Sequence, residues 1–192
     1  MDQTLRNFFL QYGGKQIQYL DKIGSLARQK TIKKGSFLLE EGAICKNFYI
    51  VISGSFRLYY LKDGIDTSVW FSFKNNSSIE LHSYISQSPS EYYIECIEDA
   101  EVIIISKSDI DLLCQTNPTI DALFKCFWQD VVQHLINRLT NLQKYSAEER
   151  YIKLIEDTDY LNQIPQKYIA SYIGVTTTSL SRIRRKIKTK LS

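Results

Sequence analysis

Short hydroxyl side chains and arginines are concentrated near the C-terminus, in the stretch TTTSLSRIRRK (176–186). Short hydroxyls allow a helix to approach base edges closely, and arginine can bond guanine O6 and N7 bidentately. Six basic residues and no acidic one lie from Arg182 to Lys190, which gives a local field that attracts phosphate. The pattern predicts a DNA-contacting helix, against the alternative of a solvated basic helix. The predicted contact residues are Thr176, Thr177, Thr178, Ser181, Arg182, Arg184, Arg185 and Lys186.

Two short helices are expected to position these side chains. Ile169, Ala170 and Ile173 lie three to four residues apart, which places them on one side of a helix. Gly174 interrupts this pattern, and Thr176 can cap a second helix. The inward face of the second helix would consist of Leu180, Ile183 and Ile187. Two helices joined by a short turn that contains Gly form a helix-turn-helix.

The composition is that of an ordinary globular protein, with 44% hydrophobic and 23% charged residues among 192. This length allows one large domain or two small ones. The net charge of +3 is small, but the positive charge is concentrated near the C-terminus. No apolar run reaches the roughly 18 residues that a membrane span needs. The stretch MDQTLRNFF lacks the pattern of a signal peptide, so we expect a cytoplasmic protein without a membrane partner.

The sequence gives little support for a metal centre or an enzyme active site. The four cysteines, at 45, 96, 114 and 126, have no CxxC or CxxH spacing and are expected to be reduced, mostly buried thiols. His82 and His134 are the only histidines, whereas a catalytic metal site needs several convergent ligands. The sequence contains no Ser-His-Asp, P-loop or GxGxxG pattern. We therefore expect neither an enzyme nor a bound metal or cofactor.

Two kinds of pattern precede the C-terminal half. The first thirty residues carry apolar positions at helical spacing, with a break at Gly13-Gly14. Residues 31–106 contain short apolar or alternating runs with glycines at the corners, which favours a β-sandwich or a small barrel. Within them, Asp63-Gly64 is typical of a hairpin turn. Residues 80–84 are expected to form a helical turn between strands.

Asn117-Pro118 predicts the start of a long helix, because Asn is a good N-cap and Pro suits the first helical position. Neither Gly nor Pro follows until after Tyr145, so the helix would be about 42 Å long. We expect its apolar stripe to pack partly on the sheet and partly on a second copy of the chain, rather than wholly inside a monomer. The predicted dimer interface is Phe124, Phe127, Val131, Leu135, Leu139 and Leu142. Ser146 and Glu149 form a capping box that starts a separate helix.

In this order of parts the chain resembles the Crp/Fnr family of bacterial transcription regulators. Gly35, Gly42 and the run Ile50-Val51-Ile52-Ser53-Gly54 carry the resemblance, and IASYIGVTTTSLSRIRRKI (169–187) carries it more specifically. The resemblance implies an α+β fold with a jelly-roll-like double-stranded β-helix, called a β-roll, flanked by helices. The implied domains are a sensor domain over 1–116, a long dimerisation helix over 117–145 and an all-α helix-turn-helix domain over 146–192.

The same resemblance assigns roles to part of the basic helix. Thr177, Thr178 and Arg182 fall where family members carry base- and phosphate-contacting residues. The β-hairpin wing that often follows the recognition helix is expected to be missing or very short here, since residue 192 follows this helix closely. Phosphate contacts are therefore expected from the basic segment Arg184–Lys190.

The segment that would hold an effector departs from the family pattern. Members that bind cyclic AMP carry G-E, a short helix and then R-S or R-T, and this arginine pairs with the cyclic phosphate. Here Glu80 matches, but Ile79 replaces the glycine and Ser90 the arginine. Losing a charge-assisted contact from a buried site costs on the order of a few kcal/mol, and no Arg or Lys lies between residues 75 and 106 to restore it. We expect that cyclic AMP is not the effector; the candidate pocket residues are Glu80, Leu81, Ser90 and Glu91.

The residue patterns needed by two other sensor types of the family are not found in this sequence either. The iron–sulfur type needs closely spaced N-terminal cysteines, and the first cysteine here is Cys45. A haem-based sensor would need an axial ligand, and we interpret His82 and His134 as surface or packing residues.

These patterns together predict a homodimeric transcription regulator that binds a palindromic DNA site with half-sites one helical turn apart. The expected partners are double-stranded DNA and a second copy of the chain, with RNA polymerase in addition if the protein activates transcription. The small-molecule effector is not identified; it would act by shifting the population between two dimer states. The alternative is a ligand-binding β-roll that regulates a protein partner without sequence-specific DNA binding.

Overall fold

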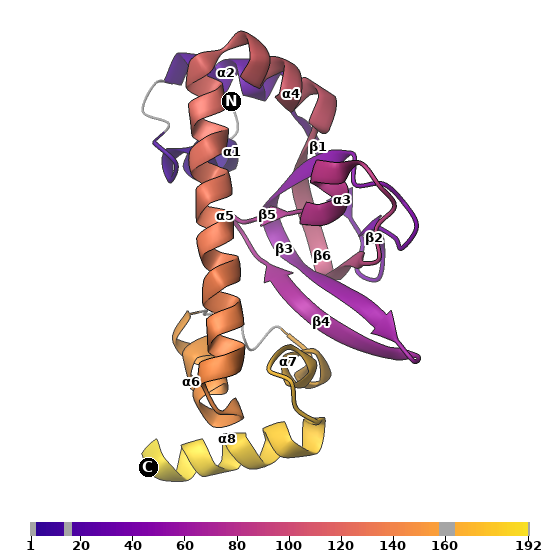
Figure 1. Ribbon diagram of the computed structural model, residues 1–192, viewed down its shortest axis with the longest axis vertical. Coiled ribbons are helices and arrows are strands. Elements are labelled where there is room, and N and C mark those ends of the chain that lie inside the picture. Colours follow the sequence, from indigo (N-terminus) through magenta and orange to yellow (C-terminus); the bar gives the residue numbers. More distant parts are fainter. Residues whose placement is uncertain (1–2, 14–16, 158–163, 192) are drawn as a thin grey trace.

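The computed structural model describes residues 3–13, 17–157 and 164–191. A long helix runs along the molecule, with a β-sheet on one side of it and shorter helices at both of its ends (Figure 1). The sheet is antiparallel. The structure thus confirms the predicted α+β class at the level of an antiparallel sheet combined with helices.

Two helices precede the sheet, α1 (Gln3–Leu10) and α2 (Ile17–Leu26). Leu5, Phe8 and Phe9 of α1 are at most 1% exposed, because they pack into the main core. The prediction of helices in the first thirty residues is confirmed. Of the predicted break, Gly13 follows α1 with a φ of +91°, and Gly14 lies outside the described residues.

Six strands form one antiparallel sheet in the order β1-β6-β3-β4, with β2 paired to β6 and β5 paired to β3. Its central pair is formed by the two longest strands, β3 and β6, which pair from Asn47↔Ser106 to Tyr59↔Tyr93. We refer to these strands and the short helix α3 (Leu81–Ser86) together as the sheet domain. The strands are β1 (Arg28–Ile32), β2 (Phe37–Leu39), β3 (Asn47–Lys62), β4 (Ile65–Ser72), β5 (Ser77–Ser78) and β6 (Tyr93–Ser106).

Gly54 allows β3 to bend in the middle of this pair. Its φ is +78°, and the register between β3 and β6 shifts on both sides of it. A Cβ at this position would lie 2.5 Å from the carbonyl oxygen of Asp99 and 2.6 Å from Cβ of Ala100. Only glycine fits here, since other residues would add both a steric clash and a strained φ.

The predicted hairpin at Asp63-Gly64 is confirmed. Lys62 pairs with Ile65, which leaves Asp63 and Gly64 as a two-residue loop between β3 and β4. Their φ values of +53° and +76° suit the type I′ turn that matches the twist of the flanking strands.

Three helices lie between β5 and the C-terminal region: α3 (Leu81–Ser86), α4 (Lys107–Thr116) and α5 (Pro118–Lys144). The predicted start of the long helix is confirmed, because the Asn117 side chain accepts hydrogen bonds from the backbone N–H groups of Thr119 (3.0 Å) and Ile120 (3.2 Å). At 27 residues, α5 is about 40 Å long. The predicted helical turn in residues 80–84 is confirmed as α3.

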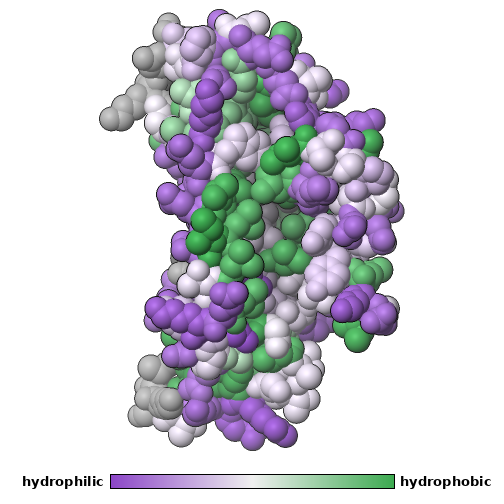
Figure 2. Space-filling model, in the orientation of Figure 1, coloured by the Kyte–Doolittle hydropathy of each residue, from purple (hydrophilic) through white to green (hydrophobic). Residues whose placement is uncertain are grey.

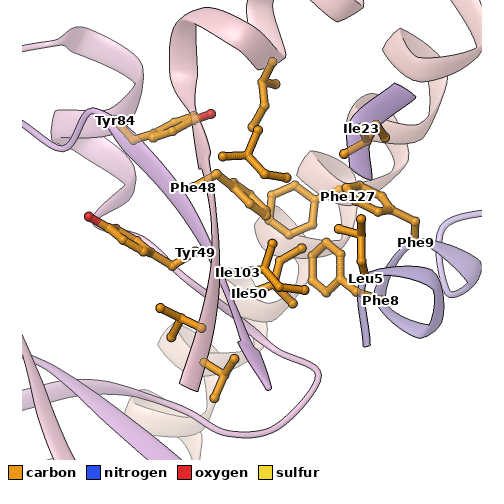
Figure 3. Close-up of a cluster of buried hydrophobic side chains, with 14 of the residues drawn as sticks. Leu5, Phe8, Phe9, Ile23, Phe48, Tyr49, Ile50, Tyr84, Ile103 and Phe127 are labelled. Atoms are coloured by element: carbon orange, nitrogen blue, oxygen red, sulfur yellow. The ribbon is translucent and has the colours of Figure 1, made fainter. Parts of the chain in front are cut away.

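The main core joins α1, the sheet and the first half of α5. Phe8, Phe9, Phe48 and Phe127 point toward one another (Figure 3), and Phe48 and Phe127 have ring centroids 5.2 Å apart. Most ring pairs in this cluster meet edge to face, the geometry that aromatic quadrupoles favour. The core therefore fixes the first half of α5 to the sheet domain.

This packing corrects part of the predicted dimer interface. Phe124 and Phe127 are only 2% and 1% exposed within one protomer, and Val131 is half-buried against the same core. These two phenylalanines cannot face a partner, because the sheet domain and α1 already cover them. Leu135, Leu139 and Leu142 remain exposed and keep their place in the predicted interface.

In the described part of the C-terminal region there are three helices: α6 (Ala147–Asp157), α7 (Gln166–Tyr172) and α8 (Thr177–Leu191). The capping box that precedes α6 is confirmed. The backbone N–H of Ser146 donates to Glu149 Oε2 (2.8 Å), and the Ser146 hydroxyl accepts from the Glu149 N–H (3.3 Å). The Ser146 hydroxyl also donates to Glu149 Oε2 (2.7 Å), and this bond, followed by the one from the Ser146 N–H, lowers the pKa of the Glu149 carboxyl below its ordinary value. The long helix therefore ends before residue 146, and α6 begins separately.

Candidate nucleic-acid interface

The turn between α7 and α8 has the predicted helix-turn-helix form. Gly174 has a φ of +75°, which ends α7, and the N–H of Val175 donates to the carbonyl oxygen of Ala170 (2.9 Å). Thr176 then caps α8, because its hydroxyl accepts from the N–H of Ser179 (3.2 Å). The chain turns sharply here and leaves α8 at an angle to α7.

The inward face of α8 packs as predicted. Leu180 is fully buried, and Ile183 and Ile187 pack against the same cluster. This cluster also contains Tyr151 from α6 and Ile169 from α7. The three C-terminal helices therefore share a small core, and this core determines which side of α8 faces outward.

The outward face of α8 presents the predicted DNA-contacting residues to solvent. In Figure 1, α8 lies across the end of the molecule that is opposite to α2 and α4. Arg184 is half-buried, whereas the other seven predicted residues are exposed. These seven are Thr176, Thr177, Thr178, Ser181, Arg182, Arg185 and Lys186. A helix with short hydroxyls near its N-terminus and arginines after them can enter a major groove.

Lys186 has an additional role that the sequence did not predict. Its ammonium group lies 2.5 Å from Oε2 of Glu148, in the first turn of α6. This ion pair joins α8 to α6, and it engages the positive charge of Lys186 within the protomer. We therefore rank Lys186 below Arg182 and Arg185 as a phosphate contact.

Arg138 of α5 holds the C-terminal end of α7. It donates a hydrogen bond to the carbonyl oxygen of Tyr172 and lies 3.6 Å from the centroid of the Tyr172 ring. The last carbonyl groups of a helix lack partners within the helix, so a guanidinium is well suited to bind them. The long helix is thus attached directly to the first helix of the helix-turn-helix.

Arg150 of α6 makes a similar bridge. Its Nε donates to the carbonyl oxygen of Ile173 (3.1 Å) at the end of α7. Its Nη1 donates to the carbonyl oxygens of Leu142 (3.3 Å) and Tyr145 (2.6 Å) at the end of α5. One side chain therefore joins the ends of two helices. Sequence reasoning missed both arginines, because the α7 carbonyl groups that they bind lie 34 positions from Arg138 and 23 positions from Arg150 in the chain.

The four predicted pocket residues have structural roles or surface positions. Glu80 is 4% exposed and caps α3, since its carboxylate accepts from the N–H groups of His82 (3.0 Å) and Ser83 (2.7 Å). Ser90 is 3% exposed, and its hydroxyl donates to the carbonyl oxygen of Tyr92 (3.0 Å). Leu81 is half-buried and Glu91 is exposed. The carboxylate of Glu80 is thus already bonded to the backbone.

A cavity of about 280 Å³ lies elsewhere in the sheet domain, between β2 and the start of β3. Its lining includes Leu39, Cys45 and Tyr49, and none of the four predicted pocket residues. Burial raises the pKa of the Cys45 thiol, and likewise that of Cys96, to about 11. At neutral pH these two thiols are therefore protonated and unreactive.

The histidine and cysteine side chains do not form a metal site in the part of the chain that the structure describes. Among the described residues, no group of three or more His, Cys, Asp or Glu side chains could hold a metal ion. His82 and His134 are both exposed, on α3 and α5. All four cysteines are free; Cys45 and Cys96 are buried, Cys114 is half-buried and Cys126 is exposed. The expectation of mostly buried thiols is therefore correct for two of the four. None of the helices in the described ranges is long and apolar enough to span a membrane.

The described part of the chain thus combines a sheet domain, a long helix and a C-terminal group of helices with α8 exposed at its end. Comparison with known proteins agrees. Residues 29–117 match the family model of the cyclic nucleotide-binding domain. No curated protein matches the sequence significantly.

Solved structures extend the likeness to nearly the whole chain. FixK2 from Bradyrhizobium japonicum is 19% identical over 85% of each chain, with a TM-score of 0.74. The c-di-GMP responsive regulator CLP of Xanthomonas campestris is 14% identical over 91% of this chain and 92% of its own, with a TM-score of 0.69. The catabolite activator protein of Thermus thermophilus is 18% identical over 93% and 86%, with a TM-score of 0.58. Residues 29–117 are thus similar to the cyclic nucleotide-binding domain, and the chain has the fold of these solved regulators. The predicted resemblance to the Crp/Fnr family is supported.

Proposed function

We propose that this protein is a homodimeric transcription regulator of the Crp/Fnr type that binds a palindromic DNA site. The observation that carries the proposal is the outward face of α8, where Thr177, Thr178, Arg182 and Arg185 are all exposed beside a capped helix N-terminus. Hydroxyls and guanidinium groups suit base edges and phosphates. In the proposed division of the chain, residues 1–116 form the sensor domain, 117–145 the connecting helix and 146–192 the DNA-binding domain.

Exposed apolar side chains on the second half of α5 support the proposed homodimer. Five of its apolar side chains are between 39% and 61% exposed. Figure 2 shows apolar side chains gathered over the middle of this helix. A second copy would cover this stripe by pairing the two helices, as in a coiled coil. The five residues, which we call the exposed stripe, are Val132, Leu135, Ile136, Leu139 and Leu142.

The effector is proposed to be something other than cyclic AMP. Glu80 already bonds the backbone of α3, and Ser90 stands where a phosphate-binding arginine is expected. An effector would act by changing how the two long helices pair and hence the spacing of the two α8 helices. We further propose that the protein works in the cytoplasm and, if it activates transcription, that it contacts RNA polymerase.

A binding experiment tests the proposal. DNA is first selected from a random pool, and the affinities for the selected and for random duplexes are then measured over a range of salt concentrations. Arg182→Ala with Arg185→Ala is compared with Arg28→Ala and Lys30→Ala, which remove two exposed basic residues from β1. We expect the wild-type protein to select a palindromic site. The first variant should lose affinity for this site, by about 1–3 kcal/mol per base-contacting arginine, and the control should retain that affinity.

A different result would favour the alternative function. If no site is selected, and if both variants reduce binding to random DNA equally, the basic helix supplies only an electrostatic contact. The sheet domain would then regulate a protein partner without sequence-specific DNA binding.

A further inference from the structure

Arg57 is a buried charge at the centre of the sheet. It lies on β3, is 2% exposed, and is the largest of the fully buried side chains. Two carboxylates compensate its charge: Glu95 of β6 at 2.7 Å and Asp66 of β4 at 3.1 Å. A buried guanidinium is unfavourable unless it is paired and bonded in this way. Three strands thus contribute to one ion cluster.

The two faces of the Arg57 guanidinium are covered by aromatic rings. Its central carbon lies 3.9 Å from the ring centroid of Tyr59 on the same strand and 3.6 Å from that of Tyr168. Tyr168 belongs to α7, the first helix of the helix-turn-helix, and is 8% exposed. The burial of Arg57 is therefore completed by a residue of the DNA-binding unit, more than 100 positions away in the chain.

Contacts around this stack attach α7 to β4. The N–H of Ser68 donates to the hydroxyl of Ser171 (2.7 Å), and that hydroxyl donates to the carbonyl oxygen of Asp66 (3.3 Å). Phe71 of β4 and Tyr172 of α7 have ring centroids 5.2 Å apart. In Figure 1, α7 lies next to the β3–β4 hairpin, between the sheet and α8.

We propose that Arg57 is a positioning residue for DNA recognition. It stacks on Tyr168 and so fixes the place of α7 on the sheet domain. Because α8 shares a core with α7, and the sheet domain shares a core with α5, this joint fixes α8 relative to α5 together with Arg138 and Arg150, which bind the end of α7 directly. In a dimer paired through α5, the joint then sets the distance between the two recognition helices. This inference rests on the proposed function and adds a determinant of operator spacing to it.

The planar shape of arginine is the property that the joint requires. A guanidinium can stack on two rings while its edges bond two carboxylates, whereas an ammonium group has no plane to stack. Arg57→Lys therefore retains the charge that Glu95 and Asp66 need and loses the stack. Tyr168→Leu retains apolar bulk on α7 and loses the ring. Both variants avoid the uncompensated carboxylates that Arg57→Ala would leave.

Two measurements on the full-length protein test the joint, with Arg28→Lys on an exposed part of β1 as the control. The first is affinity for random DNA and for the selected operator with its half-sites moved closer or farther apart. The second is hydrogen exchange of the α7 backbone, which needs no DNA. We expect each variant to weaken operator binding and to accelerate α7 exchange about 30-fold, the change that a desolvated cation–π contact provides. Affinity for random DNA stays the same, and the preference for one spacing is lost.

The outcomes separate the two proposals. Unchanged spacing preference together with unchanged α7 exchange overturns the role of Arg57. A loss of affinity for all DNA, with faster exchange in every element, also overturns it, because that is general destabilisation. If the wild-type protein selects no operator, the proposed function fails. In that case the hydrogen exchange of the α7 backbone alone tests whether Arg57 holds α7 on the sheet domain. Faster exchange confined to α7 and α8 supports the joint, and unchanged exchange refutes it.

Discussion

The two halves of α5 carry similar apolar patterns and have opposite environments. In the first half, Phe124 and Phe127 lie in the main core with 2% and 1% exposure. In the second half, Leu135 and Leu139 are 39% and 61% exposed. Helical spacing of apolar residues thus predicts that a face is covered, but it does not predict what covers it.

The direction of the two apolar faces explains the difference. On an ideal helix with 3.6 residues per turn, the centre of the exposed stripe lies about 100° around the axis from the centre of the buried residues. The sheet domain and α1 cover the first direction along one half of the helix only. The second direction is left for a partner. The first half of this continuous helix therefore packs in the protomer core, and in our proposal its second half forms the dimer interface.

The largest effect is expected from the buried half. Phe127→Ala removes a ring that contacts Phe8, Phe48 and Trp128, and the resulting cavity should reduce the free energy of unfolding by about 3–5 kcal/mol. Denaturant unfolding of dilute protein measures this loss. Leu139→Ala is the matched control in the exposed half, and under the same conditions it should cost less than about 0.5 kcal/mol. Equal losses would show that the two halves do not differ.

A smaller effect is expected when charge is placed on the exposed stripe. Leu135→Glu with Leu139→Glu would bury two carboxylates between paired helices, so the dimer dissociation constant should rise at least about 100-fold, or about 2.7 kcal/mol. Light scattering over a concentration series measures the change, and circular dichroism checks that the protomer stays folded.

The control for this prediction lies on the opposite side of α5. Gln133 and Asn137 are exposed there, and Gln133→Glu with Asn137→Glu adds the same charge. This variant should dimerise like the wild-type protein. Dimerisation that survives the leucine substitutions would place the interface elsewhere.

The smallest effect is expected at high pH and concerns the buried half only. Tyr12 packs on Phe127 and donates a hydrogen bond to Asp130 of α5 (3.4 Å). Burial, followed by the charge of Asp130, raises the pKa of Tyr12 to about 12. A pKa that is higher in the folded state stabilises the fold below the ordinary value of about 10, and this contribution is lost as the pH rises toward 12. The stability difference between wild type and Tyr12→Phe should therefore shrink from pH 10 to pH 12, as measured by denaturant unfolding at each pH. A constant difference would contradict it.

Several local features could be predicted from the sequence because nearby residues form their bonds. Asp63-Gly64 adopts the left-handed conformation that its hairpin needs, and Asn117 caps the helix that begins one residue later. Ser146 and Glu149 bond each other across one turn. The exposed face of α8 was predictable for the same reason, since its core residues and its polar residues alternate at helical spacing. The Crp/Fnr resemblance followed from the order of these local features.

Long-range packing decided the rest. Nothing near Phe124 in the sequence indicates that α1 and β3 cover it, and nothing near Glu80 distinguishes a ligand from a helix cap. In the sequence Arg57 is an ordinary strand residue, and only folding brings Glu95 and Tyr168 into contact with it. The sequence by itself determined where helices, turns and the basic face occur, because these depend on hydrogen bonds and periodicity within a few residues. Only the tertiary structure determined which faces are free and what holds α8, because burial depends on side chains that are distant in the chain.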